Sequence, residues 1–217
     1  MSDIFDEVAE ELRAERAQRL LKRYGPLLIG AALLIVAGVG GWQVWRWRQA
    51  QEDIAAGQHY LAAMALEATP AAAADRKALI AQFEAVARSA PDGYRTLARL
   101  QAAAVQAQNG DLGAALALWN AVATDEAADP LLRGVANLLW CQHQIDTGDV
   151  GLLTARLRGL AEPGNPWRPL AEEQLALLDL RQGKTAAAKT TLSHLSQDLT
   201  APRGVRGRAA ALLQQLG

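Results

Sequence analysis

Aromatic residues are scarce in this chain. They make up 5% of its 217 residues, whereas 51% of the residues are apolar and alanine is abundant. β-Sheets favour aromatic and β-branched side chains, so this composition argues against a sheet protein. Alanine is the best helix former and is small enough to let helices pack closely. The composition therefore predicts an all-α fold.

Cysteine is almost absent, and neither sign of charge predominates. Cys141 is the single cysteine, which excludes an internal disulfide and a cysteine-based metal site. Its small size favours a packing role, and an intermolecular disulfide in an oxidising compartment is the alternative. The 22 Lys and Arg residues nearly balance the 23 Asp and Glu residues, so the chain lacks the basic surface typical of nucleic-acid binders.

Recognisable catalytic and cofactor motifs are also missing. His59, His143 and His194 are far apart in the sequence and show no metal-binding spacing. The glycine-rich stretch at 38–41 lies inside an apolar segment, where it cannot serve as a phosphate-binding loop. We therefore expect no enzymatic activity, no cofactor, no metal ion and no small-molecule substrate.

Charged residues are absent from one long stretch near the N-terminus. Residues 24–45 read YGPLLIGAALLIVAGVGGWQVW. About 20 apolar residues in a helix span the roughly 30 Å hydrocarbon core of a bilayer, so this stretch predicts a transmembrane helix. Aromatic rings, which prefer the membrane interface, occur at its two ends. These residues are Tyr24, Trp42, Trp45 and Trp47.

The flanking charges predict the orientation of this helix. Basic residues crowd its N-terminal side, whereas only Arg46 and Arg48 follow closely. Cytoplasmic flanks carry the excess of Lys and Arg, so the N-terminus is expected in the cytoplasm. A cleavable signal peptide is the alternative, although its apolar region would usually be shorter. The predicted organisation is a tail at 1–23, a transmembrane helix at 24–45 and a second domain at 46–217.

Beyond the apolar segment the chain repeats itself. Gly110, Gly148 and Gly183 recur at spacings of 38 and 35 residues. Periods of this length are typical of stacked helical repeats. Each glycine is expected to end a first helix in a left-handed conformation. Prolines at similar spacings are expected to stop each second helix and to start the next unit. These prolines are Pro91, Pro130, Pro166 and Pro202.

Alignment of the units on their glycines brings further positions into step. Small residues recur on both helices of a unit, where they would let the helix axes approach. In the first helices these are Ala98, Ala136 and Ala171, followed by Ala103, Cys141 and Ala176. In the second helices the aligned sets are Ala115, Leu153 and Ala188, then Trp119, Leu157 and Leu192, then Val122, Leu160 and Leu195. A weaker unit is expected from helices at 52–67 and 77–91, and a terminal capping helix at 203–217.

These residues resemble a tetratricopeptide repeat. The stretch NGDLGAALALWNAVATDEAADP looks like the second half of that helix–turn–helix unit, and the small positions match its pattern. Leu153 stands where alanine is usual, so the repeats are degenerate. The resemblance implies a helical solenoid that binds other proteins in a groove formed by its first helices.

We expect the groove to be mostly apolar, and to accept an apolar or amphipathic segment of a partner or the protein's own terminal helix. The alternative is that neighbouring helices cover these side chains, in which case polar substitution at Leu138 or Leu177 would unfold the domain. The predicted groove residues are Leu97, Leu100, Val135, Leu138, Ile145, Leu170, Leu177 and Leu180.

The overall layout resembles the YfgM-like ancillary subunits of the SecYEG translocon. The resemblance rests on the order of tail, membrane helix and repeats, and on the GWQVWRWRQAQ exit from the membrane. It implies a bacterial inner-membrane protein with a periplasmic repeat domain, which links the Sec translocon to periplasmic chaperones. An assembly scaffold for another cell-envelope complex, such as the division or outer-membrane machinery, is the alternative.

Overall fold

A computed structural model of the chain describes residues 3–69 and 75–217, and every regular element in these two ranges is an α-helix. The all-α prediction is confirmed for this part of the chain. The chain divides after Glu52 into two compact units. The helices are α1 (Asp3–Glu67), α3 (Arg76–Ser89), α4 (Asp92–Gln108), α5 (Leu112–Ala123), α6 (Pro130–Gln142), α7 (Val150–Leu160), α8 (Arg168–Arg181), α9 (Thr185–Gln197) and α10 (Arg203–Gln215).

The first unit contains the larger part of α1. Its described large apolar side chains, which begin at Leu33, are exposed. No helix has a stretch long and apolar enough to cross a membrane within the part of the chain that the structure describes. The predicted membrane segment includes residues 24–29 and 31–32, whose side chains lie outside that part.

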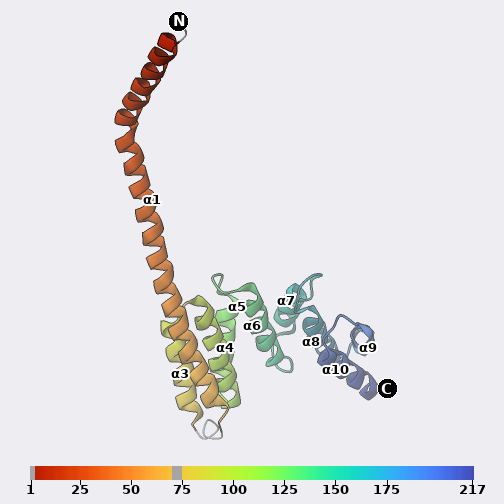
Figure 1. The fold of residues 1–217 in the computed structure, drawn as a ribbon. Helices are drawn as coiled ribbons and strands as arrows, with labels where there is room; N and C mark the ends of the chain where they lie inside the picture. Colours follow the sequence, from red (N-terminus) through yellow and green to blue (C-terminus); the bar gives the residue numbers. More distant parts are fainter. Residues whose placement is uncertain (1–2, 70–74) are drawn as a thin grey trace. The chain divides into compact units, whose positions relative to one another are not determined.

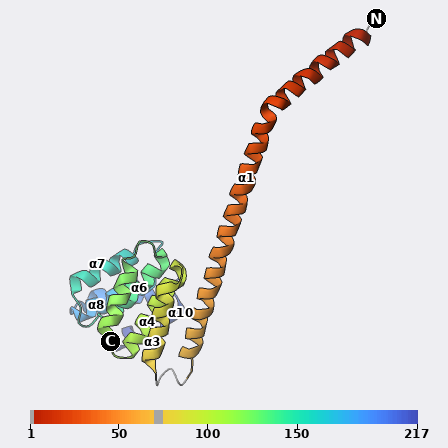
Figure 2. The same cartoon turned by 90° about the vertical axis from the view of Figure 1, so that its left-hand side faces the viewer.

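The second unit is a series of helix pairs in sequence order (Figure 1). The end of α1 pairs with α3, α4 with α5, α6 with α7 and α8 with α9, while α10 stands alone at the C-terminus. The first helices also contact one another along the series, because α4 meets α6, α6 meets α8 and α8 meets α10. Figure 2 shows the same series from the end that carries α3. This arrangement is the predicted solenoid, with the unit boundaries that the glycines and prolines indicated.

The predicted packing positions are confirmed by their burial. All of the aligned small and large positions are buried, and Ala209 of α10 takes the place of the repeated alanines of the first helices. Cys141 is fully buried at one of the small positions, and burial raises the pKa of its thiol to about 11. The folded chain therefore holds Cys141 as a protonated packing residue, with its sulfur out of reach of a second chain.

The hydrophobic core is divided into clusters that follow the repeats. Each cluster combines buried side chains of a first helix, of the second helix after it and of the next first helix. The helices that meet in this way are α1, α3 and α4, then α4, α5 and α6, then α6, α7 and α8, and finally α8, α9 and α10. Helix α4 therefore contributes to three clusters, and α6 and α8 contribute to two each.

The end of α1 serves as the first helix of the weaker unit, as predicted for residues 52–67. Ala56, Gly57 and Ala63 are buried on its packing face. A Cβ atom on Gly57 would come within 2.8 Å of the hydroxyl of Tyr94 on α4. Glycine at this position therefore lets α1 and α4 approach closely.

The glycine turns differ in one respect from the prediction. Gly110 and Gly183 adopt φ angles of 87° and 73°, which are left-handed as expected. The prediction is wrong for Gly148, which is not among the residues with positive φ. Helix α6 ends early, at Gln142, and the turns that follow bring Gly148 against Gln144, whose carbonyl oxygen would lie 2.9 Å from an added Cβ. Glycine is therefore required at position 148 because the backbone of Gln144 lies too close for a side chain, and not because of a left-handed conformation.

The residue after the turn glycine starts the second helix. Asp111 and Asp149 are the N-caps of α5 and α7, and their carboxylates accept hydrogen bonds from backbone N–H groups at 3.1 and 2.7 Å. Such caps satisfy N–H groups that the first turn of a helix leaves free. Lys184 occupies this position before α9 and provides no side-chain cap. The aspartate of each Gly-Asp pair thus begins the second helix of its unit.

Gly134 on α6 provides room for the indole of Trp167, which precedes α8. A Cβ atom on Gly134 would lie 2.3 Å from the indole Cδ1, and the indole Nε1 donates a hydrogen bond to the carbonyl of Leu131 at 3.2 Å. We expect Gly134→Ala to lower the free energy of unfolding by about 1–3 kcal/mol, because the overpacked indole must move. Urea denaturation followed by circular dichroism measures this.

Gly159→Ala is the matched control. Gly159 lies on α7, and no atom lies within 4 Å of its added Cβ. Its replacement should be neutral or should stabilise the helix by up to about 1 kcal/mol. Equal stability of the two variants would show that the contact between Gly134 and Trp167 does not constrain the fold.

Candidate partner-binding site

Three of the predicted groove residues line one open groove. Ile145, Leu170 and Leu177 meet in a cavity of about 740 Å³ that lies between the turn after α6, helix α8 and helix α10. Ligand pockets typically have volumes of about 300–1,000 Å³ and mostly apolar walls. The groove therefore has a volume typical of a ligand pocket, and predicted residues line it only over the last third of the repeats.

The other five predicted residues lie elsewhere. Leu100 and Leu138 are buried in the hydrophobic clusters around α5 and α7, and Leu138 is only 9% exposed. Leu180 packs against the cluster under α10. Leu97 and Val135 are half-buried and do not line this groove. Neighbouring helices thus cover much of the predicted face, as the alternative expectation stated.

Helix α10 forms one wall of the groove and leaves it open. Ala211, Leu212 and Gln215 face the cavity from α10, whereas Val205 and Ala209 are buried in the core. The protein's own terminal helix therefore narrows the groove, and its opposite side completes the last hydrophobic cluster.

A charged pair stands in this wall. Arg208 of α10 donates two hydrogen bonds of 2.6 Å, from Nε and Nη2, to the two carboxylate oxygens of Glu173 on α8. Glu173 is only 3% exposed, whereas the side chain of Arg208 is 56% exposed. The hydrogen bond to Glu173 is the main cause that raises the pKa of Arg208. Because both carboxylate oxygens of Glu173 accept hydrogen bonds from Arg208, the guanidinium of Arg208 is already paired and does not offer a free cation to a partner's carboxylate.

The predicted membrane-interface residues belong to the first unit. Trp42, Trp45 and Trp47 are exposed on α1. The side chain of Tyr24 lies outside the described residues. The structure therefore presents three exposed indole rings on this unit.

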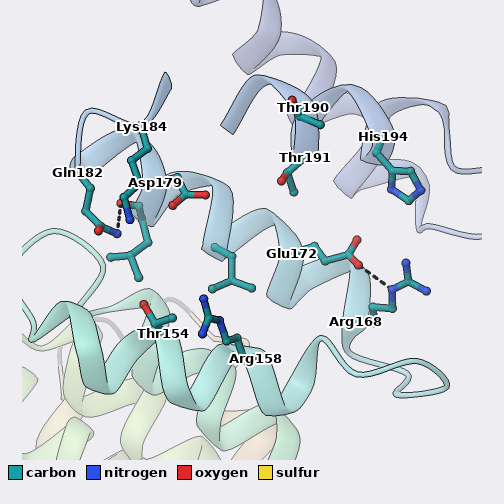
Figure 3. Close-up of a pocket in the computed structure, with 12 residues that line it drawn as sticks. Thr154, Arg158, Arg168, Glu172, Asp179, Gln182, Lys184, Thr190, Thr191 and His194 are labelled. Atoms are coloured by element: carbon teal, nitrogen blue, oxygen red, sulfur yellow. Dashed lines mark hydrogen bonds and ion pairs between the residues drawn. The ribbon is translucent and has the colours of Figure 1, made fainter. Parts of the chain in front are cut away.

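A second cleft, which the sequence did not indicate, lies over α8 between α7 and α9. It has a volume of about 490 Å³ and a floor that includes Leu175 and Leu178. Arg168 donates a hydrogen bond of 2.7 Å to Glu172 on its rim (Figure 3), and this bond raises the pKa of Arg168. Its other polar lining residues are Thr154, Arg158, Asp179, Gln182, Lys184, Thr190, Thr191 and His194.

The described residues contain no group of three or more His, Cys, Asp or Glu side chains that could hold a metal ion. The two cavities thus provide apolar surface, charged groups and hydrogen-bonding groups, which are suited to holding a polypeptide segment.

The stacked helix pairs and the groove define a helical-repeat protein. A family model described as a tetratricopeptide repeat-like domain matches residues 18–139, which is more than half of the chain. The chain belongs to this family of tetratricopeptide repeat-like proteins. No curated protein and no solved structure gives a significant match. The groove lies beyond residue 139, on the units that continue the same repeat.

Proposed function

We propose that this protein is a membrane-tethered scaffold that binds partner proteins through the groove between the turn after α6, α8 and α10. The observation that carries the proposal is the convergence of Ile145, Leu170 and Leu177 on one open cavity of about 740 Å³. Membership of the tetratricopeptide repeat-like family supports a role in protein–protein interaction. The role is binding, with no catalytic step.

The groove favours a partner segment with an apolar face. Burial of one large apolar side chain contributes roughly 1.5–3 kcal/mol. The half-buried Leu170 and Leu177 provide apolar contacts for such a side chain, while the amides of Gln142 and Gln215 stand at the edge. An amphipathic segment satisfies both, because it presents apolar side chains to the groove and polar groups to the edge.

The tether is residues 24–45. Two observations support it, namely the uncharged sequence of this stretch and the exposure of the large apolar side chains from Leu33 to Trp47. Tethering would keep the groove at a high local concentration near membrane-bound partners, so that modest affinity suffices. The N-terminus is cytoplasmic and the repeat unit periplasmic in this proposal.

The partners are subunits of the Sec translocon and periplasmic chaperones. The support is the layout of a charged tail, an apolar segment and tetratricopeptide-like repeats, which resembles YfgM-like translocon subunits. Assembly of another cell-envelope complex is the competing function, and the partners captured in cells distinguish the two.

In-cell photo-crosslinking from the groove tests the proposal. A photoreactive amino acid is placed at Leu177, which lines the groove, and at Leu199 as a control, because Leu199 is 85% exposed and lies outside it. Leu138 is unsuitable, since a probe there would sit in the core. We expect Leu177 to capture translocon subunits or chaperones and Leu199 to capture few proteins.

Two outcomes contradict the proposal. Capture of division or outer-membrane assembly proteins in place of translocon components would favour the competing function. Equal capture from Leu177 and Leu199 would show that the groove is not the binding site. Leu177→Gln is expected to retain the fold and to abolish capture by a probe at Gln142, which lies on the same groove.

A further inference from the structure

The cleft between α7 and α9 lies on the opposite face of α8 from the groove. A helix has 3.6 residues per turn, so each residue advances about 100° around the axis. Leu170 and Leu177 of the groove therefore fall on one side of α8, and Leu175 and Asp179 of the cleft fall on the other. A segment bound in the cleft would not compete with one bound in the groove.

The equivalent place in the preceding unit is filled by an arginine. Trp140 on α6 and Leu175 on α8 each lie eight residues before the glycine of their unit. Over Trp140, the guanidinium of Arg156 lies 3.9 Å from the ring centroid. Arg156 also donates hydrogen bonds to Asn120 at 2.6 Å and to Asn137 at 3.3 Å. Arg156 thus closes this position with contacts from α5, α6 and α7.

Over α8, other residues replace Trp140 and Asn137, and the equivalent place is the open cleft. Leu175 replaces the indole, and Glu172, the counterpart of Asn137, is engaged by Arg168 at 2.7 Å. Arg158 extends from α7 toward α8 in Figure 3. It forms no ion pair with another described residue. By the same spacing, Thr191 stands in the place of Arg156 and Arg158 in the place of Asn120. The cleft over α8 therefore lacks the arginine that fills the equivalent place in the preceding unit.

The charges that line the cleft leave it positive. Arg168 and Glu172 neutralise each other, which leaves Arg158 and Lys184 against the single carboxylate of Asp179. Arginine forms strong, often bidentate hydrogen bonds with carboxylates. Arg158 is exposed, so the carboxylate of a partner can reach it. The floor of Leu175 and Leu178 provides an apolar surface beside these cations.

We propose that this cleft is a second binding site, which takes a short peptide segment of a partner with an acidic side chain next to an apolar one. The carboxylate meets Arg158, the apolar side chain lies over Leu175 and Leu178, and the hydroxyl of Thr191 and the amide oxygen of Gln182 bind the peptide backbone. Gln182 already donates its amide N–H to the carbonyl of Leu178 at 3.2 Å, which leaves its oxygen as the acceptor. The scaffold then holds two segments at once, one on each face of α8.

Fluorescence anisotropy with the full-length protein in mild detergent tests this site. The probe is a fluorescein-labelled peptide of alternating leucine and glutamate, and the control peptide carries glutamine in place of glutamate. Arg158→Glu is expected to weaken binding of the acidic peptide about tenfold or more, because it turns attraction into repulsion. Arg203→Glu makes the same change of charge at an exposed position of α10 away from the cleft, and it should leave binding unchanged.

Leu177→Gln separates this site from the groove. It should leave binding of the acidic peptide unchanged, even where it abolishes capture at the groove. The inference is overturned if Arg158→Glu binds the acidic peptide as tightly as the wild type. It is also overturned if the glutamine peptide binds equally well, or if Leu177→Gln weakens binding as much as Arg158→Glu. Circular dichroism of each variant tests whether the substitution leaves the fold intact.

Discussion

Trp119→Ala is expected to lower the free energy of unfolding by about 3–5 kcal/mol. Trp119 is 1% exposed in the cluster that joins α4, α5 and α6, and its ring stacks on His143 with 4.7 Å between the ring centroids. Since small domains are stable by only about 5–15 kcal/mol, this one change removes a large part of the total. Urea denaturation followed by circular dichroism measures the loss.

Two control variants define the cause of this effect. Trp119→Phe retains most of the buried ring, and the indole Nε1 has no hydrogen-bond partner among the described residues, so this variant should lose much less stability. Leu152→Ala truncates a large apolar side chain that is 44% exposed on α7, and it should cost less than about 1 kcal/mol. A loss of similar size in Trp119→Ala and Leu152→Ala would contradict the central role of the indole in the core.

Arg208→Ala is expected to lower the free energy of unfolding by about 2–3 kcal/mol. The substitution leaves the buried carboxylate of Glu173 without its partner, and breaking a fully buried pair costs about 3–5 kcal/mol. The expected loss is smaller here, because the side chain of Arg208 is 56% exposed and water reaches the guanidinium. Chemical denaturation at neutral pH and low salt measures it.

A double variant tests whether the loss of the ion pair is the cause. Replacement of both Glu173 and Arg208 by leucine removes the uncompensated charge and should recover most of the loss. Arg203→Ala, on the exposed side of the same helix, should have little effect. If the double variant is as unstable as Arg208→Ala, the loss comes from the packing of the Arg208 side chain instead of its charge.

The repeat phase could be predicted because it depends on local chemistry. The glycines and prolines at the repeat spacing lie near the ends of helices, and the small residues between them lie where helix axes approach. Gly148 shows the limit of this reasoning. The length of α6 decides whether its glycine takes a left-handed conformation, and that length depends on the turns from residue 143 to 147 rather than on the glycine itself.

The groove could be predicted only in part. Leu138 and Leu177 are both apolar residues of first helices, yet one is in the core and the other lines an open cavity. In alanine-rich helices more than one face is apolar, so spacing alone does not distinguish the face that meets the next helix from the face that meets a partner. The cleft over α8 was missed because its residues come from three helices and share no spacing in the sequence.

The division of the core into clusters has a consequence for how the second unit unfolds. Because α4, α6 and α8 each belong to more than one cluster, the unit behaves as a row of coupled segments with interactions only between neighbours. Helix α10 has a neighbour on one side only and is the segment from which such a row frays. Helix α10, which forms one wall of the groove, is therefore also the terminal helix of this row. A partner peptide that contacts both α8 and α10 would stabilise α10 against local unfolding.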